Sequence, residues 1–228
     1  MENNETINTK PSLKGLWLLV VMSLIYIFVP SFVIAILLRT TTIDDTLATI
    51  IGSSSVAVIF FFMFFNMLKE DYKKYINTKD SFKTSLKYWL KGFGLMYISN
   101  LILVLFVFKG KIATNEELNR EILSKVPLIG FLEVSLVAPF VEELIFRFGL
   151  RKFIGKNKYF PIITALVFGV LHAVTGITSW MDLLYTIPYG ALGYVFGLSY
   201  NETDNIFTSM VSHSVHNTVS FILIMLFS

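Results

Sequence analysis

The chain has 228 residues, of which 54% are hydrophobic and 15% are charged, and its formal net charge is +3. This charged fraction is well below the roughly 25% of soluble globular proteins, which excludes an ordinary soluble domain. The absence of cysteine excludes disulfides and thiolate metal sites. The lysines and arginines cluster in short segments beside apolar runs, so the net charge does not indicate a nucleic-acid partner.

The apolar residues lie in runs long enough to cross a membrane, since about 20 apolar residues span roughly 30 Å of hydrocarbon as a helix. The sequence predicts an all-α, polytopic transmembrane helical bundle of about seven spans, with six and eight as alternatives. The fifth run is short enough to be a buried core helix or a re-entrant segment. The predicted spans are 15–38, 46–68, 88–108, 126–146, 160–173, 183–200 and 206–227.

The chain divides into three predicted parts. Residues 1–14 are polar and are expected to form a disordered cytoplasmic tail. Residues 15–125 hold the N-terminal spans and a basic cytoplasmic loop, and residues 126–228 hold a set of polar side chains within spans. The first span is too long for a signal-peptide core and is expected to be retained.

Basic residues predict the orientation in a cell membrane. Lysines are dense in 69–87, and a second basic cluster follows the fourth span in 151–158. By the positive-inside rule both segments are cytoplasmic, and so is the N-terminus, with Lys10 and Lys14. The stretch 69–87 also contains aromatic residues, which suits either a helix in the layer of anionic lipid headgroups or a solvated basic loop.

The fourth predicted span ends with two glutamates and an arginine. An ionisable side chain within a span is costly and is by default a candidate for function or for an internal partner. Glu143 and Arg147 are one helical turn apart in the favourable order, so we expect them to form an internal ion pair. Glu142 points about 100° away around the helix and is left free for chemistry.

Two later spans each present a polar pair one turn apart. Phe168 and His172 share a face of the fifth span, and His213 and Asn217 share a face of the seventh. Counting about 1.5 Å per residue from the expected cytoplasmic ends places the polar groups roughly 10 to 18 Å deep. A buried carboxylate beside two imidazoles and an amide is a plausible hydrolytic constellation.

Other polar and small residues in the spans favour less reactive roles. His216 is expected near the site or at lipid headgroups, and Asn100 is expected to form interhelical hydrogen bonds. Glu133 lies half a turn from Glu142 and nearer the opposite surface, which leaves it out of the site. The step from Gly193 to Gly197 predicts close packing against another helix.

These residues, in this order, resemble the three motifs of the CAAX-protease and bacteriocin-processing family of intramembrane endopeptidases, also called the Abi or Rce1-like family. The resemblance covers roughly residues 126–228. One departure is Phe148, which precedes Gly149 where many bacterial members have glycine directly after the motif arginine, and a small change at the helix end is expected. The matching groups are Glu142, Glu143 and Arg147 (EExxxR), Phe168 and His172 (FxxxH), and His213 and Asn217 (HxxxN).

The resemblance implies a role for each residue and a substrate class. Glu142 would be the general base that activates a water, with His172 holding and polarising it. His213 and Asn217 would stabilise the oxyanion. The supporting residues Glu143, Arg147 and Phe168 would hold and tune these groups. The expected substrate is a membrane-associated or lipid-modified peptide, cleaved near the cytoplasmic half of the membrane.

Metal dependence and two other functions stay open as alternatives. Glu142, His172 and His213 could hold a zinc ion, but the chain has no HExxH signature and Asn217 is a poor zinc ligand. We therefore expect no cofactor, with zinc as the alternative. A non-catalytic member of the same fold, acting as a bacteriocin-immunity or regulatory scaffold, is a second reading. A proton-coupled transporter is a third, although no internal repeat supports it.

Overall fold

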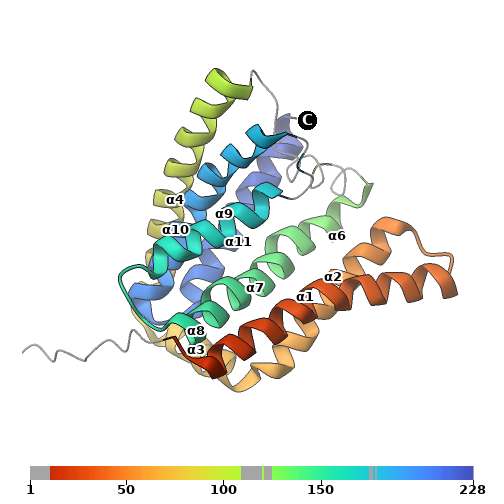
Figure 1. The fold of residues 1–228 in the computed structure, drawn as a ribbon, viewed down its shortest axis with the longest axis horizontal. Coiled ribbons are helices and arrows are strands. Elements are labelled where there is room, and N and C mark those ends of the chain that lie inside the picture. Colours follow the sequence, from red (N-terminus) through yellow and green to blue (C-terminus); the bar gives the residue numbers. More distant parts are fainter. Residues whose placement is uncertain (1–10, 109–119, 121–124, 175–176, 178, 228) are drawn as a thin grey trace, which may run out of the picture.

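The computed structural model describes residues 11–108, 120, 125–174, 177 and 179–227, which fold as helices joined by turns, with no strand among them. The predicted all-α membrane bundle is confirmed. Within the described residues, four helices are long and apolar enough to cross a membrane, over Leu13–Thr40, Asp45–Met63, Ser81–Phe108 and Ile206–Leu226. The helices converge at the end that holds α3 and α8 and spread apart toward the opposite end (Figure 1).

The N-terminal helices run as α1 (Leu13–Thr40), α2 (Asp45–Met63), α3 (Phe65–Asn77) and α4 (Ser81–Leu103), which ends in a π-helical turn, Val104–Phe108. The C-terminal part begins with α6 (Pro127–Leu132), α7 (Ala138–Glu143) and α8 (Leu150–Ile154), joined by π-helical turns over Glu133–Val137 and Leu144–Gly149. It continues with α9 (Phe160–Val174), a 3-10 turn (Trp180–Tyr185), α10 (Thr186–Thr203) and α11 (Ile206–Phe227).

Each predicted span coincides with helical structure, but two of them contain a break that the sequence does not predict. The run 46–68 is broken at Phe64, and its last residues open α3. The run 183–200 starts in the 3-10 turn, and α10 begins at Thr186. Hydropathy does not register either bend, because the residues on both sides are apolar. The count of seven spans therefore stays a prediction.

The predicted tail lies largely outside the described residues. Helix α1 begins at Leu13, where the Ser12 side chain accepts a hydrogen bond from the Gly15 amide, so the end of the 1–14 tail is helical. Residues 1–10 lie outside the described part of the chain, as does the segment 109–119 that follows α4.

The helix that carries Arg147 runs on to Ile154 and ends at Gly155, whose φ is +73°.

The short helix α9 packs closely against α10, as the glycine spacing predicts. A Cβ atom at Gly197 would lie 2.0 Å from Thr164 Oγ1, and one at Gly193 would lie 3.0 Å from Phe168 Cβ. Side chains larger than hydrogen are therefore excluded at this contact. This packing fixes Phe168, and with it His172, relative to the rest of the bundle.

The N-terminal helices also pack on the C-terminal part, so the two predicted parts form one bundle. Helix α1 contacts α2 and α8, α2 contacts α7, and α4 contacts both α10 and α11. A core of buried aromatic and aliphatic side chains joins them, with Phe60, Phe64 and Phe148 at its centre. Phe148, the departure from the family motif, stacks edge-on with Phe64 at 5.1 Å.

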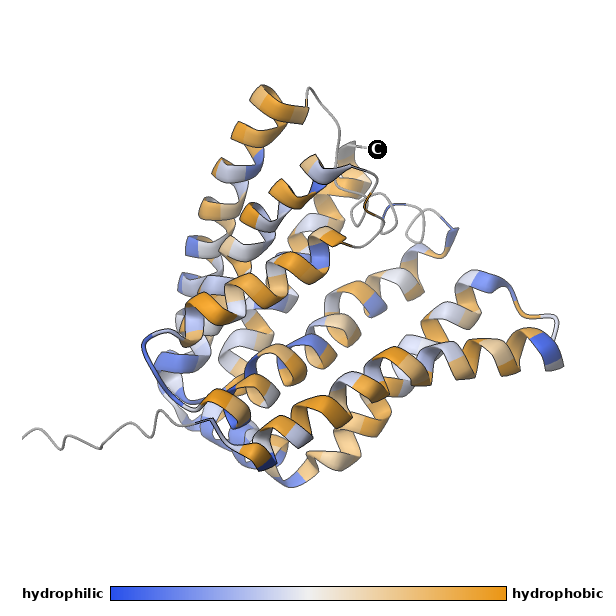
Figure 2. Ribbon diagram, in the orientation of Figure 1, coloured by the Kyte–Doolittle hydropathy of each residue, from blue (hydrophilic) through white to orange (hydrophobic). Residues whose placement is uncertain are grey.

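The basic segments gather at one end of the bundle. The Ser12 amide donates to the Phe153 carbonyl at 2.7 Å, and Lys74 donates to the Asp204 carbonyl at 3.0 Å. Arg151 pairs with the Asp204 carboxylate at 2.5 Å, and Lys156 pairs with the same group. Hydrophilic residues cluster at this end in Figure 2. The positive-inside pattern requires this arrangement, and the cytoplasmic location of this end stays an expectation.

Helix α3 occupies part of the 69–87 stretch, so that stretch is not simply a solvated loop. Leu68 is buried, whereas Lys69 and Lys73 are exposed. The Asp71 carboxylate accepts a hydrogen bond from the Ile206 amide, the first of α11, at 3.0 Å. Burial raises the pKa of the Asp71 carboxyl, against the opposing effect of that amide. Asp71 thus caps a helix that carries site residues.

Candidate active site

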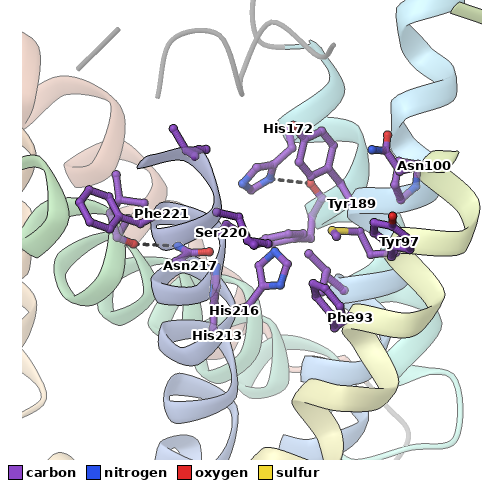
Figure 3. A pocket seen from close by; sticks show the side chains of 18 of the residues that line it. Phe93, Tyr97, Asn100, His172, Tyr189, His213, His216, Asn217, Ser220 and Phe221 are labelled. Atoms are coloured by element: carbon purple, nitrogen blue, oxygen red, sulfur yellow. Dashed lines mark hydrogen bonds between the residues drawn. The ribbon is translucent and has the colours of Figure 1, made fainter. Parts of the chain in front are cut away.

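One cavity of about 420 Å³ lies between α4, α7, α9, α10 and α11. Its walls include all four residues predicted to carry the chemistry: Glu142, His172, His213 and Asn217. Figure 3 shows His172, His213 and Asn217 among the side chains that line the cavity. Residues separated by 75 positions in the sequence are therefore brought together, as the helical spacing predicts.

The two glutamates sit at the end of α7, which is bracketed by π-helical turns. The Ala138 amide bonds to the Glu133 carbonyl five residues back, as in a π-helix. Pro139 has no amide hydrogen and cannot continue a regular α-helical ladder. The wider turn accommodates this proline, and such turns are frequent at functional sites. The local sequence thus sets the angle at which Glu142 enters the cavity.

Glu143 is fully buried and holds two partners at once. Its Oε1 atom lies 3.1 Å from Arg147 Nη1 and accepts a hydrogen bond from His213 Nδ1 at 2.9 Å. Both charged side chains are 0% exposed, and the predicted internal ion pair is confirmed. A buried pair of this kind is expensive to separate, because either charge alone would be left without compensation.

Arg147 is held on its other faces by aromatic rings and a backbone carbonyl. Its guanidinium lies 4.7 Å from the centre of the Phe168 ring and 5.5 Å from that of Phe196. It also donates to the Gly193 carbonyl at 3.3 Å. Cation–π contacts strengthen when they are desolvated, so this arginine is anchored inside the bundle.

The partners of the two histidines fix which nitrogen faces the cavity. His172 Nδ1 lies 2.9 Å from the Phe168 carbonyl, and a carbonyl can only accept, so Nδ1 carries the hydrogen. His213 Nδ1 likewise donates to the Glu143 carboxylate. Each ring therefore turns its Nε2 atom toward Glu142. The Phe168 ring lies 4.0 Å from the His172 ring and supports it, in line with the predicted supporting role.

Glu142 differs from its neighbour in both exposure and partners. Its side chain is 14% exposed, and its Oε2 atom lies 3.7 Å from His172 Nε2 and 3.8 Å from His213 Nε2. Within the described residues this buried oxygen has no hydrogen-bond partner. The separations are too long for direct hydrogen bonds, and they suit a group placed between the three atoms.

The three converging atoms are chemically alike when the imidazoles are neutral. A carboxylate oxygen and two unprotonated Nε2 atoms are all acceptors. They fit a group that donates hydrogen bonds, such as a water molecule, and they are also donor atoms that zinc accepts. Among the described residues, however, no group of three or more His, Cys, Asp or Glu is arranged to hold a metal ion.

Asn217 makes one contact that the sequence does not predict. Its Nδ2 atom donates to the Val134 carbonyl, in the π-helical turn before α7, at 2.7 Å. An amide nitrogen carries two hydrogens, so one remains for another acceptor. Asn217 therefore ties α11 to the helix that carries Glu142, and this contact fixes the direction of the second N–H.

Two residues that were not expected in the site line the cavity, and a third stays outside it. His216 is only 7% exposed and lines the cavity, so its placement at lipid headgroups is wrong. Asn100 of α4 also lines the cavity. Glu133 accepts a hydrogen bond from Ser54 of α2 at 3.1 Å, in agreement with its exclusion from the site. The sequence does not indicate that α4 forms part of the cavity wall, because the residues of α4 that line the cavity are not ionisable and belong to no recognised motif.

A comparison with protein families matches residues 124–219 to the family described as type II CAAX prenyl endopeptidase Rce1-like. The match includes every predicted site residue. The C-terminal region is therefore similar to the Rce1-like family. The resemblance seen in the sequence is confirmed, and a membrane protease-type function is supported at the level of this family. Helices α1 to α4 lie outside the matched region.

Similar proteins are found in bacteria. The UPF0177 protein YvdC of Lactococcus lactis is 28% identical over 151 residues, which cover 62% of this chain and 56% of that protein. The UPF0177 protein YxdF of the same organism is 26% identical, over 62% of this chain and 78% of that protein. The uncharacterized protein YpbD of Bacillus subtilis is 31% identical, over 45% and 49%. The chain thus spans about half the length of YvdC and YpbD. No solved structure matches it.

Proposed function

We propose that this protein is an intramembrane endopeptidase that hydrolyses a peptide bond in a membrane-associated or lipid-modified peptide. The observation that carries the proposal is the convergence of Glu142 Oε2 with the Nε2 atoms of His172 and His213 at the wall of one cavity. The family match supports the same class of activity.

The reaction follows from the positions of these groups. Glu142 accepts a proton from a water molecule while the water oxygen attacks the carbonyl carbon of the peptide bond. His172 Nε2 accepts a second hydrogen bond from the same water and orients it. The tetrahedral intermediate then collapses, the carbon–nitrogen bond breaks, and Glu142 returns the proton to the departing amine. The products are a carboxylate and an amine.

The remaining residues stabilise the charge of the intermediate. The free N–H of Asn217 would donate to the oxyanion, and the His213 ring, which Glu143 holds through Nδ1, would help to stabilise the same negative charge. Removing one such donor typically costs about 10² to 10³ in rate. Arg147 contacts neither water nor substrate in this scheme and holds Glu143 in place.

The membrane placement is part of the proposal. The end that holds Arg151, Lys156 and Lys74 would face the cytoplasm of the cell, with the N-terminus on the same side. The cavity would then lie within the cytoplasmic half of the bilayer. Lipid would surround the exposed apolar faces of α1 and α2, which stand out in Figure 2.

The direct test uses purified full-length protein in lipid vesicles and a mixture of membrane peptides, with products read by mass spectrometry. The wild type is expected to release defined fragments, and Glu142→Gln is expected to release none while keeping the wild-type unfolding midpoint. Wild-type rates from the variant would contradict the proposal. If substitutions of Glu142, His172 and His213 all preserved the cellular phenotype, a non-catalytic scaffold would be the better account.

Metal dependence is decided by a separate measurement. We propose a mechanism that needs no metal, since the chain has no HExxH signature and Asn217 is a poor zinc ligand. Cleavage should therefore survive dialysis against a series of chelators of increasing zinc affinity. Loss of activity that zinc restores would assign Glu142, His172 and His213 as ligands instead.

A further inference from the structure

The cavity has a second wall, which faces the reactive groups. It is formed by α4, with Phe93, Tyr97 and Asn100, and by the side of α11 that carries His216 (Figure 3). Helix α4 lies outside the region that matches the family, and the proposed chemistry uses none of these residues. This wall is therefore available for a different task.

His216 is the polar group of this wall. Its side chain is more than nine-tenths buried, at 7% exposure, and within the described residues its Nδ1 atom has no hydrogen-bond partner. The ring points from α11 toward α4, where its centre lies 6.3 Å from that of Phe93. A buried ring nitrogen without a partner is unfavourable, so a ligand that supplied a hydrogen bond there would gain affinity.

The surroundings of His216 are aromatic. The rings of Phe93 and Tyr97 stack at 6.0 Å with an interplanar angle of 20°. Tyr185 and Tyr189 also line the cavity. Aromatic rings pair favourably with one another in offset or edge-on arrangements. Such a wall suits a flat ring, and the imidazole suits a polar group at the tip of that ring.

We propose that His216, Phe93 and Tyr97 form a subsite that selects a tyrosine side chain in the bound peptide. The proposal rests on the proposed function in that a peptide occupies the cavity. The phenol ring would lie against Phe93 and Tyr97, and its hydroxyl would hydrogen-bond to His216. A purely aliphatic lipid chain would fill the same space but would leave the His216 nitrogen without a partner.

Binding tests this subsite apart from cleavage. Pairs of fluorescent peptides that carry Tyr or Phe at one position, moved along the sequence, are titrated into the full-length Glu142→Gln variant in detergent. We expect one position at which the Tyr peptide binds roughly tenfold more tightly than its Phe partner, the size of one net hydrogen bond. His216→Phe or His216→Leu in the same background should reduce this ratio to about one. His216→Asn, whose amide replaces Nδ1, should retain part of it.

Several results would overturn the subsite. Equal binding of Tyr and Phe peptides at every position would do so, even if the wild type cleaves peptides in a Glu142-dependent way. Equal weakening of both peptides by His216→Leu would assign His216 a structural role instead. A Tyr preference that His216→Leu abolishes would support the subsite even if the wild type cleaved nothing, which separates the two proposals. Leu95→Ala, on the exposed face of α4, is the matched control and should leave the ratio unchanged.

Discussion

The carboxylates of Glu143 and Asp204 each pair with two basic side chains, but the first is buried in the bundle and the second is exposed to solvent. Glu143 binds Arg147 and His213 and is 0% exposed, whereas Asp204 binds Arg151 and Lys156 and is 49% exposed. The first cluster sits beside the cavity, and the second ties helix ends together at the basic end of the bundle. Loss of one ion-pair partner should therefore change the free energy of unfolding much more at Glu143 than at Asp204.

Glu142 belongs to neither pattern. It neighbours Glu143 in sequence, yet its buried oxygen has no partner in the described residues, and its side chain is partly exposed to the cavity. An intramembrane carboxylate held by an arginine and a histidine indicates a structural role, whereas one that faces converging acceptor atoms indicates chemistry. Substitutions at the two clusters test this distinction.

The largest expected effect is on stability, from Arg147→Met. Removing one member of a buried ion pair costs about 3–5 kcal/mol, because Glu143 is left charged and buried. The measurement is the free energy of unfolding from a detergent–denaturant titration. The double variant Glu143→Leu with Arg147→Met should recover much of that loss. An effect of Arg147→Met below about 1 kcal/mol would place this pair with the exposed one.

A smaller effect, confined to activity, is expected for Asn217→Ala. Loss of one oxyanion donor should lower kcat by roughly 10²-fold to 10³-fold. The lost bond to Val134 should lower stability by only about 1 kcal/mol. Ser220→Ala, on the same helix and the same cavity, is the control and should stay near wild type. If Asn217→Ala kept full kcat, Asn217 would be left with only its structural contact.

Asp71→Ala should destabilise the protein moderately. The variant removes the cap on the Ile206 amide, and caps of this kind contribute about 0.5–2 kcal/mol. Asp71→Asn keeps an acceptor oxygen and should lose less. Unfolding titrations of the two variants provide the measurement. Equal losses would show that the charge, and not the hydrogen bond, carries the contribution.

The smallest expected effect is that of Asp204→Ser. Exposed ion pairs contribute about 0–1 kcal/mol and are screened by salt. The unfolding free energy should therefore change by less than about 1 kcal/mol and should converge with that of the wild type at high ionic strength. A loss comparable to that of Arg147→Met, persisting at high salt, would abolish the contrast between the two clusters.

The sequence was sufficient for some of these features and not for others. The positions of Glu142, His172 and His213 around one space followed from the helical spacing, because each lies on a regular helix face. The break at Phe64 and the start of α10 were missed, because apolar residues continue through both bends. The contact of His213 with Glu143 was missed because it joins residues 70 positions apart.

The cavity wall formed by α4 is another feature that the sequence does not predict, because it depends on how helices pack together. Phe93 and Tyr97 look like ordinary span residues, and only the packing of α4 against α10 and α11 turns them toward the cavity. The burial of His216 likewise depends on a neighbouring helix. Sequence patterns report the faces of single helices, whereas such walls are assembled from several.

The most direct test of the central claim compares two glutamates on the same helical run. Glu142→Gln and Glu133→Gln each remove one intramembrane carboxylate, but Glu133 is hydrogen-bonded to Ser54 away from the reactive groups. Peptide cleavage by the two purified, folded variants is measured side by side in vesicles. We expect no turnover by Glu142→Gln and near wild-type turnover by Glu133→Gln. Retained turnover by Glu142→Gln, or equal loss in both variants, would contradict it.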